Sequence, residues 1–288
     1  MFEGSYVALV TPFSNGKVDT KKLKDLVDFH LQNGTHGIVP VGTTGESPTL
    51  SKDEKADVIK TVVKTVRGRV PVVAGTGTND TRGSIEYTKA ARELGADAAL
   101  VVTPYYNKPT QEGLYRHYEA ISRAADLPLC LYNVPGRTSV NLLPETVARL
   151  AKIKNVSAIK EASGNVEQVT QIRSLCAIRI VSGEDSLTYP ILCLGGIGVI
   201  SVAANIVPKA VAEMCEAALK GDHKRARELH ERYFALNKAL FIETNPAPVK
   251  TAMKMMGLLN GQLRLPLCEM SEANEAKLRD ALKQYELA

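Results

Sequence analysis

Lys160 stands near the end of a short apolar run, residues 156–162, and is followed directly by Glu161. One interpretation is an ordinary strand end, because a lysine chain can carry its ammonium into water. The other is a buried parallel strand, whose carboxyl end is where ligands of α/β folds bind and where a lysine is partly desolvated. Desolvation favours a neutral amine, which can form an imine with a carbonyl compound. Lys160 is therefore a candidate nucleophile.

Hydroxyl groups and one further cation follow other apolar runs, where they could support imine chemistry. An imine nitrogen accepts electrons, which allows a proton to leave the neighbouring carbon. Tyrosine and threonine hydroxyls can pass such protons because each donates and accepts hydrogen bonds, and the arginine fork suits a carboxylate. The candidates at the run ends are Thr43, Thr44, Tyr105, Tyr106, Tyr132, Arg137, Gly183 and Ile200.

Several of these candidates also have a purely structural interpretation. A tyrosine at a strand end is often a packed aromatic with its hydroxyl in water. Thr43 and Thr44 lie among glycines and could form only a turn and a helix cap. Arg137 could pair with a surface acid. The residue pattern by itself leaves both interpretations open.

Eight apolar runs alternate with longer segments of helical periodicity, and these elements must position the candidates. The runs are residues 6–10, 37–41, 70–74, 98–102, 129–132, 156–162, 179–183 and 198–202. Helices are expected from about Asp19, Ser51, Asp80, Thr110, Pro144, Asn165 and Ser186. The runs are continuous, as strands of a parallel sheet buried on both faces require.

The pattern predicts an α/β fold, a (β/α)8 TIM barrel with a C-terminal helical extension. Eight strand-helix units in a chain of 288 residues suit one barrel, for which about 250 residues are typical. The alternative is an open doubly wound sheet, which needs a glycine-rich phosphate loop after the first strand. Residues 11–13, Thr-Pro-Phe, are no such loop.

The C-terminal part has more helices than one barrel unit needs. Helical segments are expected at residues 208–219, 222–241, 245–257 and 271–285. We therefore expect residues 1–222 to form the barrel that carries the active site, and residues 223–288 to form a C-terminal helical region. The sequence does not say whether this region covers the barrel mouth or contacts another subunit.

Composition narrows the class of protein. A hydrophobic content of 44% and a net charge of +5 suit a globular chain, and the basic residues are interleaved with acids, so no nucleic-acid partner is expected. Five cysteines without a CxxC pair are typical of a reduced, cytoplasmic protein. We find no membrane span or targeting segment in the sequence.

Metal and nucleotide cofactors are not expected. The five histidines, His30, His36, His117, His223 and His230, show neither HxH nor HExxH spacing. The glycine clusters at residues 75–77 and 195–198 lack the GxGxxG spacing, and no Walker sequence is present.

Five motifs spread along the chain carry a family resemblance. They are GTTGES at residues 42–47, TPYYNKPTQEG at 103–113, YNVPGRT at 132–138, IKEASGN at 159–165 and ETNPAPVK at 243–250. With these motifs the chain resembles the dihydrodipicolinate synthase family of pyruvate-dependent class I aldolases, which includes N-acetylneuraminate lyase. The resemblance covers nearly the whole chain.

The resemblance implies a role for each candidate. Lys160 would form an imine with pyruvate without an external cofactor. Tyr132 would shuttle protons, linked through Thr43 to Tyr106 of a neighbouring subunit. Thr44 and the backbone at Gly183 and Ile200 would hold the pyruvate carboxylate. Arg137 would receive the carboxylate of L-aspartate 4-semialdehyde. The activity implied is that of 4-hydroxy-tetrahydrodipicolinate synthase in lysine and diaminopimelate biosynthesis, in a cytoplasmic homotetramer or, in some members, a dimer.

Two other functions remain open at this stage. A sister class I aldolase, similar to N-acetylneuraminate lyase, would use the same pyruvate chemistry with another aldehyde. Arg137 and the doubled tyrosine at residues 105 and 106 favour the synthase branch. A non-enzymatic member of the fold is the third alternative, and an intact set of Lys160, Tyr132 and Thr43 argues against it.

The resemblance also bears on feedback inhibition by free lysine at a subunit interface. Ser47, Asn79 and Tyr105 agree with lysine-sensitive members of the family. Lys55 stands where those members carry a histidine, and Gly83 where they carry a glutamate. A cation at position 55 repels the ammonium group of a bound lysine molecule. Without a glutamate at position 83, that ammonium group also lacks an anionic partner. We expect weak or no inhibition.

Overall fold

Eight parallel strands form one sheet in the computed structural model, which describes residues 1–287. They are β1 (Gly4–Ala8), β4 (Gly37–Val39), β5 (Val73–Gly75), β6 (Ala98–Val102), β7 (Leu129–Asn133), β8 (Val156–Glu161), β9 (Arg179–Ser182) and β10 (Gly198–Ser201). The order across the sheet is β4-β1-β10-β9-β8-β7-β6-β5. The first strand therefore pairs with the last, with Gly4 opposite Gly198.

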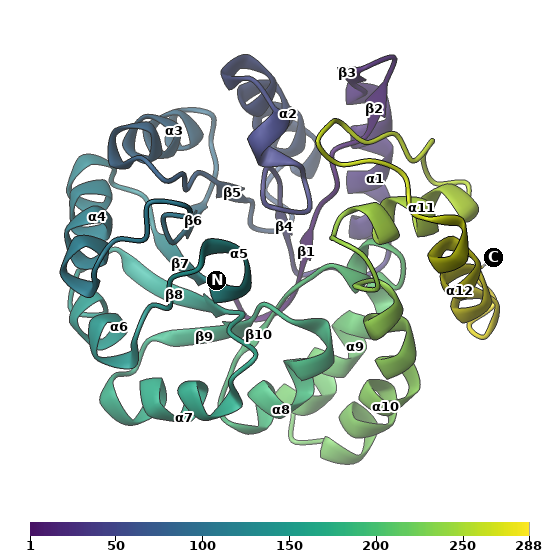
Figure 1. Ribbon diagram of the computed structural model, residues 1–288. Helices are drawn as coiled ribbons and strands as arrows, with labels where there is room; N and C mark the ends of the chain where they lie inside the picture. Colours follow the sequence, from purple (N-terminus) through teal and green to yellow (C-terminus); the bar gives the residue numbers. More distant parts are fainter. Residues whose placement is uncertain (288) are drawn as a thin grey trace.

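The two remaining edges, β4 and β5, meet and close the sheet. Ile38 and Val72 form a parallel bridge, and the Ile38 amide donates to the Pro71 carbonyl at 3.0 Å. The Gly75 amide donates to the Pro40 carbonyl at 2.9 Å. The fold is a (β/α)8 barrel with a C-terminal helical part, as the sequence predicts (Figure 1).

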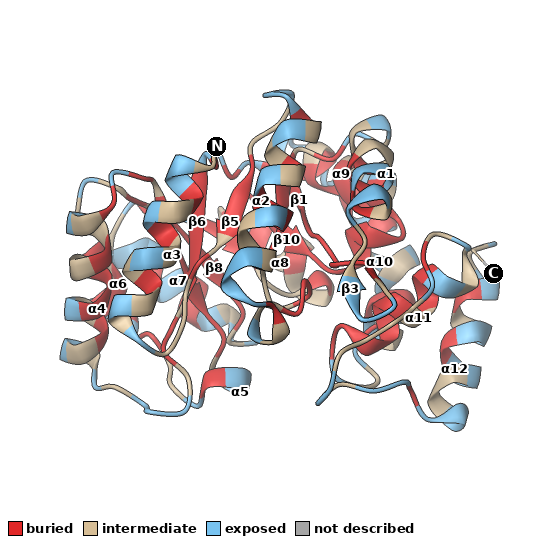
Figure 2. Cartoon of the chain, turned by 90° about the horizontal axis from the view of Figure 1, so that it is seen from above, coloured by how far each residue is buried: buried red, intermediate tan, exposed pale blue. Residues whose placement is uncertain are grey.

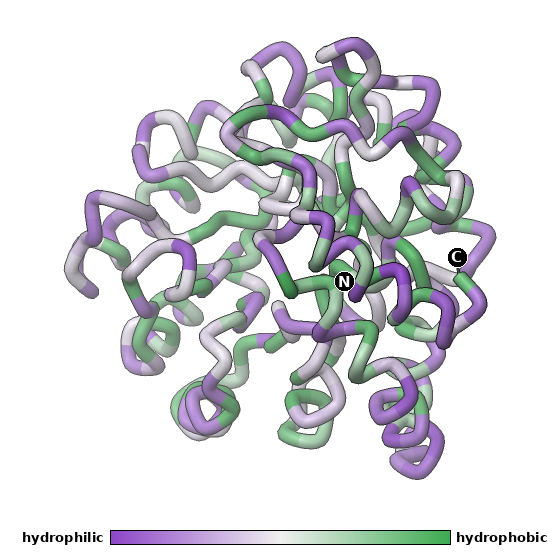
Figure 3. Tube along the Cα trace, turned by 45° about the vertical axis from the view of Figure 1, so that its right-hand side comes forward, coloured by the Kyte–Doolittle hydropathy of each residue, from purple (hydrophilic) through white to green (hydrophobic). Residues whose placement is uncertain are grey.

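Helices surround the barrel on its outside (Figure 1). They are α1 (Thr20–Gln32), α2 (Lys52–Val66), α3 (Thr81–Glu93), α4 (Gln111–Ala124), α6 (Pro144–Leu150), α7 (Val166–Leu175), α8 (Thr188–Cys193) and α9 (Pro208–Leu219). Local capping fixes several starts: Asp19 accepts from the Lys22 amide at 2.9 Å, and Ser51 and Glu54 form the expected capping box. Figure 3 shows hydrophilic stretches along the outer helices and loops.

Two layers of apolar side chains stabilise this arrangement. One lies between the strands and the helices, and the other fills the barrel interior. Figure 2 shows buried residues along the strands and on parts of the surrounding helices. Along β7 and β8 the interior layer takes alternate residues, including Cys130, Tyr132, Ala158 and, just beyond β8, Ala162. Lys160 lies between Ala158 and Ala162 in this alternation, so its side chain also faces the interior.

The C-terminal helices are α10 (His223–Ala239), α11 (Ala247–Met255) and α12 (Glu272–Lys283). Figure 2 shows α11 on the same side of the molecule as α5 (Pro135–Thr138), the short helix that follows β7. Since α5 marks the carboxyl ends of the strands, the C-terminal region extends to the barrel mouth. The division at residue 222 falls between α9 and α10 and stays a prediction.

Some element boundaries differ from the expected ones. The run expected at 70–74 becomes a strand only from Val73, because Pro71 has no amide hydrogen for the ladder. The helix expected from Ser186 is a 3-10 turn, Asp185–Leu187, followed by α8. The hairpin of β2 (Phe13–Ser14) and β3 (Lys17–Val18), and the helix α5, were not expected.

Residues 1–287 show neither a membrane-spanning helix nor a metal-binding cluster. Within that range, no helix has the length and apolar character needed to cross a bilayer. The same residues contain no cluster of three or more histidine, cysteine, aspartate or glutamate side chains arranged to hold a metal ion.

Candidate active site

Lys160 and Tyr132 lie side by side on neighbouring strands, and both point into the barrel. They are register partners on β8 and β7, and both are buried, at 5% and 6% exposure. The Lys160 Nζ lies 4.3 Å from the centroid of the Tyr132 ring. The lysine is therefore no solvent-exposed strand end, and the structure favours the second interpretation, a partly desolvated amine at the end of a buried strand.

A cavity of about 580 Å³ at the barrel mouth brings most of the predicted site together. Its wall includes Thr43, Thr44, Tyr132, Arg137, Lys160, Gly183 and Ile200. These seven residues come from the ends of β7, β8, β9 and β10, from α5, and from the loop after β4. The barrel gathers them because the loops at the carboxyl ends of its strands share one face.

Gly183 is the position in this wall that requires glycine. A Cβ built there lies 2.5 Å from the Ala162 Cβ and 3.0 Å from the Lys160 Cε. Any side chain would displace the lysine or the end of β8. The absence of a side chain at Gly183 therefore leaves the room in which the Lys160 amine lies.

Hydrogen bonds within the loop after β4, and others from distant segments, hold this loop and its two threonines. The Glu46 amide donates to the Thr43 carbonyl at 3.0 Å, and the Thr11 hydroxyl donates to the Gly45 carbonyl at 2.6 Å. Thr44 is buried, and its Oγ1 accepts a hydrogen bond from the Asn245 Nδ2 at 3.0 Å. The threonines are thus fixed in the wall by contacts from distant segments.

Arg137 lies on α5, directly after the strand that carries Tyr132. It is exposed, and its Nη2 donates to the Asn245 backbone carbonyl at 3.2 Å. None of the ion pairs found in residues 1–287 involves this arginine. Its remaining guanidinium donors can therefore receive an anion in the cavity.

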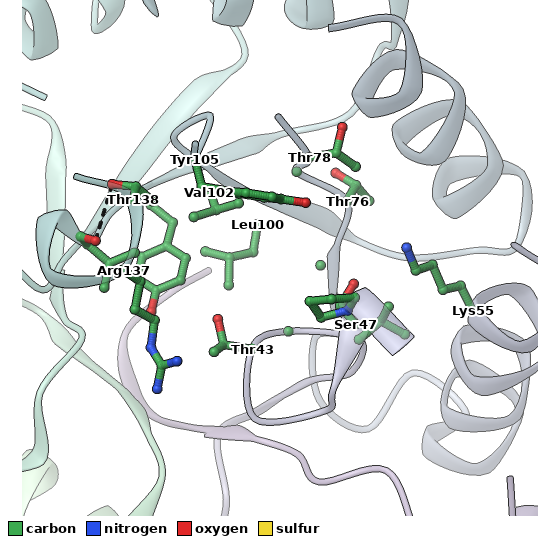
Figure 4. A pocket seen from close by; sticks show the side chains of 17 residues that line it. Thr43, Ser47, Lys55, Thr76, Thr78, Leu100, Val102, Tyr105, Arg137 and Thr138 are labelled. Carbon is green, nitrogen blue, oxygen red and sulfur yellow. Dashed lines mark hydrogen bonds between the residues drawn. The ribbon is translucent and has the colours of Figure 1, made fainter. Parts of the chain in front are cut away.

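A second cavity of about 230 Å³ adjoins the first and shares Thr43, Tyr132 and Arg137 with it. It extends past Tyr105 to Lys55 on α2. Figure 4 shows Arg137 and Lys55 on opposite sides of this space with Thr43 between them. The wall of the smaller cavity is mostly apolar, with hydroxyls of Thr76, Thr78 and Ser47 along it.

Tyr106 is the one predicted catalytic residue that the single chain does not bring to the site. It is 89% exposed, with a backbone φ of 74°, and it lines neither cavity. Tyr105, its neighbour, lines the smaller cavity instead. The loop therefore turns Tyr106 away from Lys160 of its own chain.

Buried groups around Lys160 are uncharged or strongly hydrogen-bonded. Burial raises the pKa of the Cys130 thiol to about 12, so this thiol does not compete as a nucleophile. Burial also raises the pKa of Asp185, whose carboxylate accepts from the Ser201 hydroxyl and from the Val202 and Ala203 amides. These bonds fix the chain just after Ile200.

The segment from Phe241 to Asn245 was missing from the predicted site. All five of its residues line the larger cavity. Asn245 contacts both Thr44 and Arg137, and it lies in the ETNPAPVK motif, one of the five motifs that carry the family resemblance. The motif was the available signal, but it did not indicate a role for this asparagine.

Comparison with known proteins places this site in a family. The model of the dihydrodipicolinate synthetase family matches residues 1–285. The chain belongs to this family. A relative from Geobacter sulfurreducens named 4-hydroxy-tetrahydrodipicolinate synthase is 57% identical, with 100% of both chains covered. This result confirms the family that the five sequence motifs predict.

Solved structures of the dihydrodipicolinate synthetase family have the same fold. The dihydrodipicolinate synthase from Aquifex aeolicus is 49% identical over 99% of both chains, with a TM-score of 0.98. The enzyme from Acinetobacter baumannii, solved in complex with pyruvate, is 49% identical over 100% of both chains, also with a TM-score of 0.98.

Proposed function

We propose that this protein is a 4-hydroxy-tetrahydrodipicolinate synthase, a Schiff-base-forming lyase that condenses pyruvate with L-aspartate 4-semialdehyde. The observation that carries the proposal is the buried Lys160 amine 4.3 Å from the Tyr132 ring, in a cavity that also holds Thr44 and Arg137. The full-length similarity to relatives of that name supports the same activity. No external cofactor is needed, because the lysine itself supplies the electron sink.

In the first half of the reaction the Lys160 amine attacks the keto carbon of pyruvate. The carbinolamine loses water and becomes an imine, and the Tyr132 hydroxyl passes the protons that this requires. Loss of a proton from the pyruvate methyl group then gives the enamine. Thr44 and the backbone at Gly183 and Ile200 hold the pyruvate carboxylate in the cavity.

In the second half the enamine carbon attacks the aldehyde carbon of the semialdehyde, which regenerates the imine. The amino group of the condensed product then attacks the imine carbon and displaces the Lys160 amine, closing the ring. Arg137 holds the semialdehyde carboxylate during both steps, as a bidentate guanidinium-carboxylate pair. Binding both substrates next to the lysine supplies the orientation that the carbon-carbon bond needs.

We infer that Tyr106 enters the site of a neighbouring copy of the chain and completes a proton path through Thr43 to Tyr132. Its 89% exposure and its orientation away from the chain's own cavity support this assignment. The inferred assembly is a homotetramer acting in the cytoplasm. Pyruvate and the semialdehyde are its partners, and no nucleic acid or membrane is involved.

Borohydride reduction in the presence of pyruvate tests the proposal. We expect a stable adduct that peptide mapping places on Lys160, and none in a Lys160→Arg variant. Comparison of aspartate semialdehyde with N-acetylmannosamine as the acceptor then separates the synthase from a lyase-like aldolase. An adduct on another residue, or turnover of only the sugar acceptor, would disprove the assignment.

A further inference from the structure

The segment between α10 and α11 is fixed to the rest of the protein on both sides of Asn245. Upstream, the Glu243 carboxylate accepts from the Ser271 hydroxyl at 2.8 Å and from the Asn274 Nδ2 at 2.8 Å. Downstream, Lys250 donates to the Glu46 carboxylate and to the Gln262 carbonyl. The segment is therefore held firmly enough to position other groups.

Asn245 contacts both carboxylate-binding residues of the proposed site. Its side-chain Nδ2 donates to the Thr44 Oγ1 at 3.0 Å, and its backbone carbonyl accepts from the Arg137 Nη2 at 3.2 Å. The residue is only 4% exposed, and it lines the cavity that contains Lys160. Its Oδ1 is buried without a hydrogen-bond partner among the described residues.

The direction of the Asn245–Thr44 bond determines what Thr44 can do. A threonine hydroxyl has one hydrogen to donate and two lone pairs to accept with. Because Asn245 donates to Thr44, one lone pair is occupied and the hydroxyl hydrogen stays available for an anionic oxygen. The Arg137 contact likewise fixes one guanidinium nitrogen and leaves other donors for a carboxylate.

We propose that Asn245 is a positioning residue that orients the Thr44 hydroxyl toward the pyruvate carboxylate and holds the Arg137 guanidinium for the semialdehyde. This inference rests on the proposed function and adds to it a contribution from the C-terminal region. The side chain of Asn245 acts on Thr44, whereas its backbone acts on Arg137. Replacement of the Asn245 side chain should therefore weaken pyruvate binding more than semialdehyde binding.

Two substitutions separate orientation from packing. Asn245→Ala removes the donor, and we expect about a tenfold rise in the pyruvate concentration for half-maximal borohydride trapping, with a smaller change in the semialdehyde KM. Asn245→Asp keeps the size and shape of the side chain, but the carboxylate can only accept hydrogen bonds. It should take the Thr44 hydrogen and repel the pyruvate carboxylate, so its half-trapping concentration should exceed that of Asn245→Ala. Circular dichroism checks that each variant is folded.

Coupling to Thr44 provides the decisive control. In a Thr44→Val background, which keeps the shape and removes the hydroxyl, Asn245→Ala should raise the half-trapping concentration less than about twofold. Thr44→Ser, which keeps the hydroxyl, should retain the full effect of Asn245→Ala.

Two results would overturn the inference. One is an Asn245→Asp variant that traps pyruvate like the unmodified protein, and the other is an equal effect of Asn245→Ala with and without the Thr44 hydroxyl. Failure of the proposed function is recognised separately, because the unmodified protein would then form no pyruvate adduct on Lys160.

Discussion

Lys250 and Glu46 form an ion pair in which the two side chains are only 1% and 0% exposed. Lys250 also donates to the Gln262 carbonyl at 2.8 Å, and the Arg264 amide donates to the second Glu46 oxygen at 3.1 Å. Lys250 further lies 4.2 Å from the centroid of the Phe13 ring. The pair joins α11 to the loop that carries Thr43 and Thr44.

Lys250→Met should lower the free energy of unfolding by about 3–5 kcal/mol, because it leaves the Glu46 carboxylate buried without its cation. Urea unfolding followed by circular dichroism measures this. Adding Glu46→Gln to that variant should restore part of the loss, since the unpaired charge is gone. A loss below about 1 kcal/mol for Lys250→Met would show that the pair contributes little.

Arg137→Ala should raise the KM for aspartate semialdehyde about tenfold or more, the effect of losing a charge-assisted pair. Pyruvate trapping on Lys160 should change little, because Arg137 is assigned to the second substrate. Arg149→Ala provides a matched control, since Arg149 pairs with Glu112 on the outer helices at 2.8 Å. Equal effects on both substrates would contradict the assignment of Arg137.

Free L-lysine should inhibit weakly or not at all. Lys55 lines the smaller cavity near Ser47 and Tyr105, with its Nζ 4.3 Å from the Tyr87 ring centroid, so a cation already occupies this wall. A titration of activity with lysine measures the effect. Inhibition at micromolar or low-millimolar lysine would contradict the prediction, whereas the Lys55→His, Gly83→Glu double variant should gain sensitivity.

Stability should fall on mild acidification because of His30. Burial lowers the pKa of its imidazole from 6.5 to about 3. Between these values the unfolded chain binds a proton that the folded chain does not, so the contribution of neutral His30 is complete above pH 6.5 and is lost as the pH falls. The loss from this one group is about 2 kcal/mol by pH 5.

Urea midpoints between pH 7 and pH 5 measure this dependence. His30→Gln should flatten it, while His223→Gln, at an exposed position, should leave it unchanged. Identical slopes for His30→Gln and the unmodified protein would assign the acid sensitivity to other groups, such as His117, whose pKa burial lowers to about 4.

The barrel could be predicted because its strands are buried on both faces and therefore form continuous apolar runs. The short hairpin at Phe13–Val18 could not, although Asn15-Gly16 is a turn pair and both residues have positive φ. Its strands have two residues each, too few for an alternating pattern. Helix α5, only four residues long, has no periodicity to recognise.

The site was predictable where its residues end strands, as Lys160 and Tyr132 do. Asn245 was not, because its partners Thr44 and Arg137 lie 201 and 108 residues away in the chain. No local pattern encodes a contact over such separations. The position of Tyr106 outside its own cavity likewise depends on a backbone φ of 74°, which the sequence does not specify for a tyrosine.

The pairing of β1 with β10 sets an order of events during translation. As the ribosome releases the nascent chain, Gly4–Ala8 has to wait for Gly198–Ser201 before its second edge is covered. Asn245 and Lys250 emerge later still. A prematurely terminated polypeptide that ends after α9 would contain Lys160 and Tyr132, yet lack the wall that orients Thr44 and Arg137. Stalled synthesis would therefore yield a protein without a finished substrate pocket.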